Sequence, residues 1–280
     1  MTPEELRVAG FLDARRAQAF LEELPRGESW VADLSASADP DQALLQAVRL
    51  READPGLVET LSTDEHARRR VCAILGASQW LGDYVIAQPS RAAAMNEKPG
   101  EPRDVLYEAV GAHSIGGGAW VAAPEASVDD LRAAYRRVLL HLAADDLTSA
   151  SPEDMMPIVG ERIAALVDAT LDAALALARR DIDPEARVPF AIIAMGKTGA
   201  RELNYISDVD VVYVAEAGAD GDERSALEIA TRLASATASA CSGPGSEAPL
   251  WTVDANLRPE GRNGVLVRTI ESYRQYWDKW

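Results

Sequence analysis

Cysteine and histidine are scarce in this sequence, with two and three copies respectively in 280 residues. His66, His113 and His141 show no metal-ligand spacing such as H-x-x-x-H, so each is interpreted as an ordinary surface or core residue. Cys72 and Cys241 could in principle form a disulfide. Two free thiols are the better interpretation for a chain that we expect in the cytoplasm.

The chain also lacks a long apolar run and an excess of positive charge. No stretch approaches the roughly 18 apolar residues of a membrane-spanning helix. The first residues, which include Glu4 and Glu5, do not follow the basic-then-apolar order of an export signal. Lys and Arg number 28 against 45 Asp and Glu, a formal net charge of -17. This charge argues against nucleic acid or a membrane as a partner, although it leaves a local basic pocket open. We therefore expect a cytoplasmic protein.

Apolar residues at helical spacing run through the first two thirds of the chain. Thr2, Pro3 and Glu5 have the pattern of a helix N-terminus with a capping box. The apolar pattern continues to Leu21, so one helix is predicted up to the turn at Pro25. Further helices are predicted at 40–53 (capped by Asp39), from about 64, at 78–87, at 126–145 and at 152–180.

A glycine triplet, Gly116–Gly118, interrupts the helical part and is interpreted as a loop. A phosphate-binding loop is the alternative, but no Lys-Ser or Lys-Thr follows the glycines. Beyond residue 185 the pattern changes. Short apolar runs at 189–195, 204–214 and 250–257 predict strands, and 222–240 and 269–280 predict helices.

These patterns predict an α+β fold in a chain long enough for one large or two modest domains. Residues 1–185 form the predicted helical N-terminal region. Residues 186–280 form a small mixed sheet flanked by helices. The last predicted helix stops without a cap or a helix breaker, so we expect the chain to be a fragment of a longer protein.

The run from Asn204 to Val214 holds two carboxylates in a segment rich in Val, Ile and Tyr. If this run is a strand, Asp208 and Asp210 point to the same side, with Cα atoms about 6.6 Å apart. Two carboxylates so close disfavour each other's ionisation, and a divalent cation is their natural partner. The alternative is a solvent-facing pair at the mouth of a sheet, or the start of a loop.

Two further features complete a possible site. Gly196–Gly199 follows the first predicted strand, where glycines let backbone N–H groups approach phosphate oxygens and Lys197 adds a cation. Asp254 lies on the third predicted strand. A third carboxylate on a neighbouring strand can complete a two-metal site of the kind that serves phosphoryl transfer.

This order of a glycine turn, an Asp-x-Asp strand and a later acid resembles the nucleotidyltransferase superfamily. More narrowly, residues 194–210 (AMGKTGARELNYISDVD) and 253–262 (VDANLRPEGR) are similar to the two sequence signatures of the glutamine synthetase adenylyltransferase/adenylyl-removing enzyme family. These stretches are long and specific. Weaker similarity, including Leu75–Ser78, extends back through the helical region.

The resemblance implies a function. The family protein is a tandem of two related halves. This chain, too short for both, is similar to the N-terminal half, which removes AMP from a modified tyrosine of glutamine synthetase by phosphorolysis. Phosphate would attack the adenylyl phosphorus and release ADP and the free tyrosine. Carried over by position, Asp208, Asp210 and Asp254 would be catalytic and hold Mg²⁺ or Mn²⁺, and Gly196 and Lys197 would lie at the nucleotide phosphates.

Two more residues are candidates for phosphate contact. Ser207 either binds a phosphate or caps a turn. Arg258 either binds phosphate, which suits its guanidinium group, or forms a salt bridge. The chain departs from the family pattern at Asn256, where the family often has Arg, and at Ala200, where it often has Gly. The first departure concerns a phosphate contact, whereas Ala200 still permits a fairly close approach.

Other functions stay open at this point. The site chemistry is nearly symmetric, so ATP-dependent adenylylation of glutamine synthetase is an alternative. A third possibility is a binding module that recognises glutamine synthetase or a PII signal protein but lacks groups from the rest of a longer protein. The expected partners are glutamine synthetase, a nucleotide and inorganic phosphate, with the PII signal protein as a further candidate.

Overall fold

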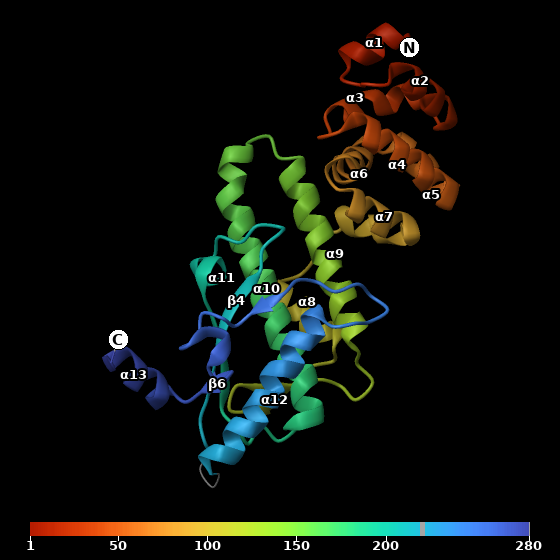
Figure 1. Ribbon diagram of the computed structural model, residues 1–280. Coiled ribbons are helices and arrows are strands. Elements are labelled where there is room, and N and C mark those ends of the chain that lie inside the picture. Colours follow the sequence, from red (N-terminus) through yellow and green to blue (C-terminus); the bar gives the residue numbers. More distant parts are fainter. Residues whose placement is uncertain (219–221, 280) are drawn as a thin grey trace. The chain divides into compact units, whose positions relative to one another are not determined.

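The computed structural model describes residues 1–218 and 222–279, and its fold is α+β. The chain forms two compact units (Figure 1). Unit 1 comprises Met1–Pro99 and Arg137–Met156, and unit 2 comprises Gly100–Arg136 and Pro157–Trp280. The predicted fold class is therefore confirmed. The predicted division at about residue 185 into a helical region and a catalytic core stays a prediction.

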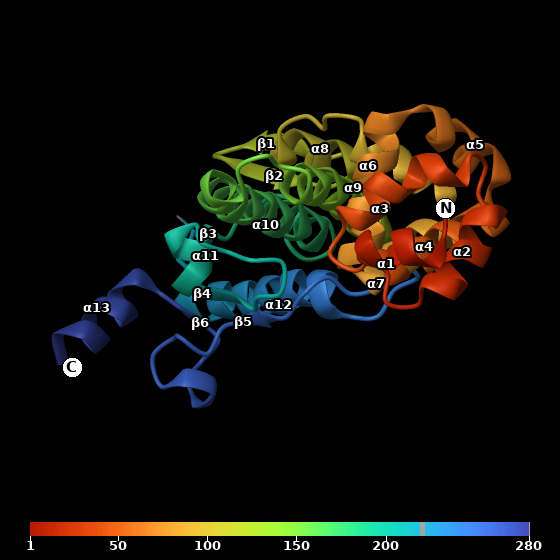
Figure 2. The ribbon, with the colours of Figure 1, turned by 90° about the horizontal axis from the view of Figure 1, so that it is seen from above.

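Unit 1 is built from helices, which Figure 2 shows from above. They are α1 (Pro3–Val8), α2 (Ala14–Glu23), η1 (Gly27–Trp30), α3 (Val31–Ser35), α4 (Pro40–Ala53), α5 (Pro55–Thr63), α6 (Glu65–Ala77), α7 (Gln79–Ala87) and η2 (Pro89–Met95). Helices α9 (Val128–Leu147) and α10 (Pro152–Ile182) contribute residues to both units.

Short polar side chains start most of these helices. Thr2 and Glu5 form the predicted capping box at α1. Asp39, Asp54 and Asp64 each accept a hydrogen bond from a backbone N–H in the first turn of α4, α5 and α6. Such caps satisfy amide groups that have no partner inside the helix. The predicted starts of α4 and α6 are confirmed.

The prediction of one helix from Thr2 up to the turn at Pro25 is wrong. The chain breaks after α1, and Gly10 has φ of 100°. Few residues other than glycine adopt that conformation, so the helix cannot continue through it. The aspartate at position 13 then caps α2 as a new helix.

The core of unit 1 is a continuous set of buried apolar side chains. It includes Leu6, Phe11, Trp30, Leu44, Val71, Ile74 and Leu75, each at most 4 % exposed. A buried ion pair lies beside it, with Arg68 Nε 2.6 Å from Asp33 Oδ2. Within unit 1, the aliphatic helix stripes therefore serve packing.

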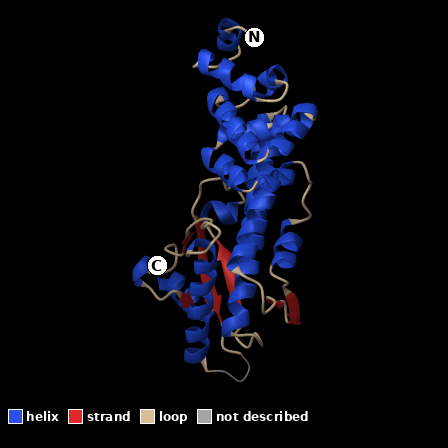
Figure 3. Ribbon diagram, turned by 90° about the vertical axis from the view of Figure 1, so that its right-hand side faces the viewer, coloured by secondary structure: helices blue, strands red, loops and turns tan. Residues whose placement is uncertain are grey.

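Unit 2 holds the sheet. Its elements are α8 (Pro102–Ala109), β1 (His113–Gly116), β2 (Ala119–Val121), parts of α9 and α10, β3 (Phe190–Ala194), α11 (Gly196–Ala200), β4 (Val209–Ala215), α12 (Glu223–Ser242), β5 (Val253–Asp254), η3 (Gly261–Asn263), β6 (Val267–Arg268) and α13 (Ile270–Lys279). Figure 3 shows the strands of this sheet beside long helices.

The glycine triplet was predicted to be a loop. In the structure it forms the turn of a small β-hairpin. His113 pairs with Val121 and Ser114 with Trp120 in an antiparallel ladder. Gly117 and Gly118 both have positive φ, as tight hairpin turns require.

The main sheet is mixed and is centred on β4. Strand β3 runs antiparallel to β4, with Ile193 opposite Val212. On the other edge of β4, two short strands pair in parallel: β5 with its start and β6 with its end. The predicted strand at 189–195 is confirmed as β3. The predicted strand at 250–257 is reduced to two residues, Val253 and Asp254.

The two faces of this sheet differ. Val211, Tyr213 and Ala215 of β4 are at most 1 % exposed on one face, and α12 contacts β4 and β6. The opposite face carries Asp210, Val212 and Val214, because alternate residues of a strand point to opposite sides. On β3, Ile193 belongs to this second face and is 44 % exposed. We call it the open face.

Both cysteines are buried and free, as predicted. Burial in apolar surroundings raises the pKa of each thiol, to about 12 for Cys241. Among the described residues, no helix combines the length and the apolar character needed to span a membrane.

Candidate functional site

Two of the three predicted aspartates lie side by side on the open face. Asp210 of β4 and Asp254 of β5 are register partners in the parallel pair. Neighbouring strands lie about 4.8 Å apart, and residues in register point to the same side. Both side chains are half-buried. Residues distant in sequence therefore place two carboxylates at one edge of the sheet.

The glycine turn closes one side of this pair. Met195 N–H donates to the carbonyl of Asp210 at 2.8 Å, which holds the end of β3 against the start of β4. Gly196 follows with φ of 51°, and a Cβ atom there would lie 2.4 Å from Asp210 Oδ2. A Cβ atom here would displace the Asp210 carboxylate, and the positive φ also favours glycine. The predicted turn is in fact a short helix, α11, on which Lys197 is exposed.

Asp208 does not lie on the strand, contrary to the prediction. Strand β4 begins at Val209, and Asp208 is exposed in the segment before it. In this segment, Asn204 Oδ1 accepts from Ile206 N–H at 3.1 Å and from Ser207 Oγ at 2.7 Å. Ser207 thus takes part in a turn that Asn204 orders. The strand argument for a shared face therefore does not extend to Asp208, and its place in the site stays a prediction.

Arg258 lies four residues after Asp254, in the segment between β5 and β6. Its Nε donates to the carbonyl of Gly264 at 3.2 Å, and its Nη1 to that of Ala255 at 2.7 Å. These bonds fold the segment back on itself and fix the guanidinium group. These contacts hold Arg258 within its own segment, and its contact with phosphate stays a prediction.

Two carboxylates of the site suit a divalent cation. Within residues 1–218 and 222–279, no three His, Cys, Asp or Glu side chains are grouped so that they could hold a metal ion. Of the three predicted aspartates, Asp210 and Asp254 are adjacent through strand register, and their carboxylates have the oxygen chemistry that Mg²⁺ and Mn²⁺ prefer. Asp254 Oδ1 also accepts from Asn256 N–H at 2.7 Å. Ligation by all three aspartates stays a prediction.

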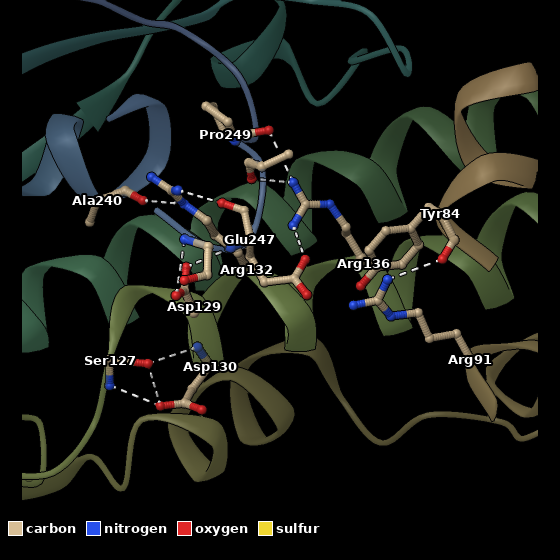
Figure 4. A network of polar contacts seen from close by, with 12 residues as sticks. Tyr84, Arg91, Ser127, Asp129, Asp130, Arg132, Arg136, Ala240, Glu247 and Pro249 are labelled. Carbon is tan, nitrogen blue, oxygen red and sulfur yellow. Dashed lines mark hydrogen bonds and ion pairs between the residues drawn. The ribbon is translucent and has the colours of Figure 1, made fainter. Parts of the chain in front are cut away.

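A buried arginine holds the segment that leads into β5 (Figure 4). Arg132 of α9 is fully buried. It donates to the carbonyls of Ala240 at 3.0 Å and Glu247 at 2.9 Å. It also donates to the carbonyl of Gly243 at 2.7 Å. These carbonyls belong to the end of α12 and to residues 243–250, which we call the clamped loop. A charged donor suits this position because the helix C-terminus is negative.

Two neighbours of Arg132 on α9 complete the clamp. Arg136 Nη1 donates to the Glu247 carboxylate at 3.0 Å, and Nη2 to the carbonyl of Pro249 at 3.0 Å. Asp129 accepts from the amides of Ser246 at 3.2 Å and Glu247 at 2.9 Å, and these bonds lower its pKa. Beyond the loop, Val209 N–H donates to the carbonyl of Thr252 at 3.0 Å. The clamp therefore fixes the approach of β5 to β4.

This clamp was not predicted from the sequence. Its signal was present, because Arg132 and Arg136 are four residues apart within the helix predicted at 126–145. Arginines at such positions need acceptors when buried. Their acceptors lie more than 100 residues away in sequence, so no local pattern identifies them.

Two titratable residues of unit 2, Tyr273 and Asp168, have shifted pKa values. Burial raises the pKa of Tyr273, and the charges of Arg268 and Arg258 partly oppose this shift. Burial also raises the pKa of Asp168 on α10, and Arg201, 3.6 Å away, opposes it. Arg201 ends α11 in a left-handed conformation. Its contacts with Asp168 and with Glu161, at 3.7 Å, attach the segment after α11 to α10.

Comparison with known proteins gives a consistent result. A sequence model of the family described as glutamate-ammonia ligase adenylyltransferase matches residues 68–280. A bifunctional glutamine synthetase adenylyltransferase/adenylyl-removing enzyme from Leifsonia xyli is 41 % identical over 100 % of this chain. Proteins of the same name from Cutibacterium acnes and Streptomyces avermitilis are 44 % and 42 % identical over 90 % and 97 % of it.

The matches cover only part of these relatives. The chain spans 30 % of the length of the Leifsonia protein, 26 % of the Cutibacterium protein and 27 % of the Streptomyces protein. The matched part is their N-terminal region. The names of the relatives describe two activities, and both belong to proteins more than three times as long as the part matched here.

Proposed function

The chain belongs to the glutamate-ammonia ligase adenylyltransferase family, and we propose that it removes AMP from adenylylated glutamine synthetase by phosphorolysis. An oxygen of inorganic phosphate attacks the adenylyl phosphorus. The bond from that phosphorus to the tyrosine oxygen breaks, the tyrosine takes up a proton, and ADP leaves. The observation that carries the proposal is the in-register pair Asp210 and Asp254 beside Gly196, in a chain of this family.

Each residue of the site has a role in this proposal. Asp210 and Asp254 would hold Mg²⁺ or Mn²⁺, and Asp208 would be the third ligand. A bound divalent cation would neutralise phosphate charge and orient the reacting oxygens. Gly196 leaves room for the nucleotide phosphates next to the Asp210 carboxylate, and Lys197 supplies a positive charge there.

Ser207 and Arg258 border the same edge of the sheet and are proposed phosphate contacts. The Ser207 hydroxyl group already donates to Asn204, so its oxygen is available as an acceptor and not as a donor unless the turn opens. Arg258 is the better candidate. Its Nε and Nη1 donate to the backbone carbonyls described above, and its Nη2 is the nitrogen proposed to donate to phosphate.

Incubation of adenylylated glutamine synthetase with this chain, phosphate and Mg²⁺ tests the proposal. We expect formation of ADP that depends on both phosphate and the metal ion. Asp210→Asn should lower the rate by about a hundredfold or more, the scale for loss of one charge-stabilising group. Asp104→Asn, a matched change at an exposed position of α8, should leave the rate unchanged.

Two results would contradict this direction of reaction. If ATP drives AMP onto unmodified glutamine synthetase and phosphate releases no ADP, the chain is an adenylyltransferase. If the chain binds glutamine synthetase or a PII signal protein without either reaction, and a longer protein restores turnover, it is a binding module. The two-activity name of the relatives is the reason to run both assays.

A further inference from the structure

An apolar pocket of about 330 Å³ lies on the open face of the sheet. Ile193 and Met195 line it from β3 and the residue that follows, and Val212 and Val214 line it from β4. Tyr276 and Trp277 of α13 line its other side. Its volume falls in the range of small-molecule pockets, which are commonly about 300–1,000 Å³.

This pocket adjoins the acidic pair. Val212 and Asp210 are two residues apart on one strand and share a face, which places their Cα atoms about 7 Å apart. Met195 lines the pocket and donates its N–H to the carbonyl of Asp210 at 2.8 Å. Arg258, which also lines it, follows Asp254 by four residues. A ligand with phosphates at the acidic pair therefore has its remaining part within reach of the pocket.

We propose that the pocket binds the adenine ring of the nucleotide whose phosphates lie at Asp210 and Asp254. The inference rests on the function proposed above, because it takes the acidic pair as the phosphate end. A purine is flat and largely apolar on its faces, so it requires aliphatic walls and aromatic rings for stacking. The pocket provides both.

The aromatic residues of α13 fit this role. Trp277 is 67 % exposed, although a large aromatic ring usually gains stability by burial. Its ring centroid lies 5.5 Å from that of Tyr273, with the planes tilted by 37°. Tyr273 is itself buried, and its hydroxyl group donates to the carbonyl of Tyr213 at 3.4 Å. Tyr273 thus anchors α13 to the sheet and leaves Trp277 free to cover a ligand.

Arg258 adds a charged group to an otherwise apolar lining. Its guanidinium group is fixed by the carbonyls of Ala255 and Gly264. A guanidinium plane held in this way stacks on aromatic rings as well as donating hydrogen bonds. The pocket therefore combines one cation, aromatic rings and aliphatic walls, as expected for a nucleobase.

Direct binding measurements on the 280-residue chain test this assignment. ADP, adenosine, pyrophosphate and tyrosinamide are titrated separately by calorimetry in the presence of Mg²⁺. Trp277→Ala should weaken ADP and adenosine binding by about tenfold or more, the scale for loss of one base-stacking ring, and leave pyrophosphate binding unchanged. Trp80→Ala is the matched control, because Trp80 is 49 % exposed in unit 1.

A second variant fills the pocket instead of emptying it. Ile193→Trp places a larger side chain at a position that is 44 % exposed, so the fold should tolerate it, and it should weaken adenosine binding similarly. The proposal is overturned if wild-type chain does not bind adenosine, if both variants bind it like wild type, or if they lose tyrosinamide binding and keep adenosine binding. Adenosine binding without ADP production would contradict the proposed reaction alone.

Discussion

Replacement of Arg132 by Leu tests whether α9 sets the position of β5. The guanidinium group is fully buried and donates to three carbonyls at 2.7–3.0 Å. Leucine keeps the aliphatic contacts and removes every donor. The carbonyls of Ala240, Gly243 and Glu247 then lose a charged partner.

The size of the effect follows from these contacts. A hydrogen bond to a charged group contributes about 1.5–3 kcal/mol, and a buried carbonyl left without a partner costs about 1–3 kcal/mol. The terms are not additive, because the clamped loop can move toward solvent. We expect a total loss of about 3–5 kcal/mol, the scale for loss of one partner of a buried charge. A change of 3 kcal/mol corresponds to about a hundredfold in the local opening equilibrium.

Native-state hydrogen exchange measures this change at the affected amides. Leu250 N–H donates to the carbonyl of Cys241 at 2.8 Å, and Val209 N–H to that of Thr252 at 3.0 Å. In Arg132→Leu, both amides should exchange about a hundredfold faster. Arg132→Lys should give a smaller increase, because an ammonium group keeps the charge but cannot reach three separate carbonyls.

The matched control is Arg224→Leu on α12. Arg224 is exposed and forms a single bond to Glu228 at 3.1 Å, four residues along the same helix. Its loss should cost only about 0.3–0.5 kcal/mol. If exchange at Leu250 and Val209 increases no more in Arg132→Leu than in this control, α9 does not hold β5 in place.

Three further predictions concern single residues. Gly196→Ala should abolish most ADP production, because its Cβ would lie 2.4 Å from Asp210 Oδ2. Gly117→Ala, at a similar φ of 61° and with nothing within 4 Å, should keep it, and equal rates would contradict the proposed site. The amides of Glu247 and Ser246 donate to Asp129 and lower its pKa. The stability that Asp129 contributes to the fold should be complete above the ordinary pKa of 3.8 and be lost as pH falls through the lowered pKa. NMR chemical shifts of those two amides measure this loss. Cys241, whose pKa burial raises to about 12, should react with a thiol reagent at pH 8 far more slowly in the folded protein than in urea, and equal rates would contradict its burial.

Local rules account for much of the helical structure. Asp39 before Pro40 and Asp64 before Glu65 mark helix starts that the structure confirms, because capping depends on residues only three positions apart. The same rules missed the break at Gly10. An apolar pattern that continues across two helices does not reveal one glycine with positive φ.

The sheet and the site depend on contacts between distant residues, and the predictions were less complete there. The sequence correctly indicated β3, yet it extended the strand of Asp210 back over Asp208. Val, Ile and Tyr favour strands wherever they occur, but Asn204 diverts the segment before Val209 into a turn. Asp254 was correctly placed on a strand, since a carboxylate after an apolar run fits a strand end. Its alignment with Asp210 depends on β4 and β5 pairing, which no local pattern encodes.

The way that β5 and β6 share one edge of β4 has a consequence for how this fold can change. Val253 pairs with Val209, and Val267 pairs with Tyr213. The segment from β5 to β6 thus advances 14 positions while β4 advances 4, so it holds 10 extra residues that form an excursion from the sheet. Doubling the length of such an excursion costs only about 0.6 kcal/mol of chain entropy. Insertions after Asn256 can therefore reshape the wall of the pocket while the carboxylate of Asp254 keeps its register. If the proposed function holds, selectivity and reactivity would be carried by parts of the chain that can vary independently.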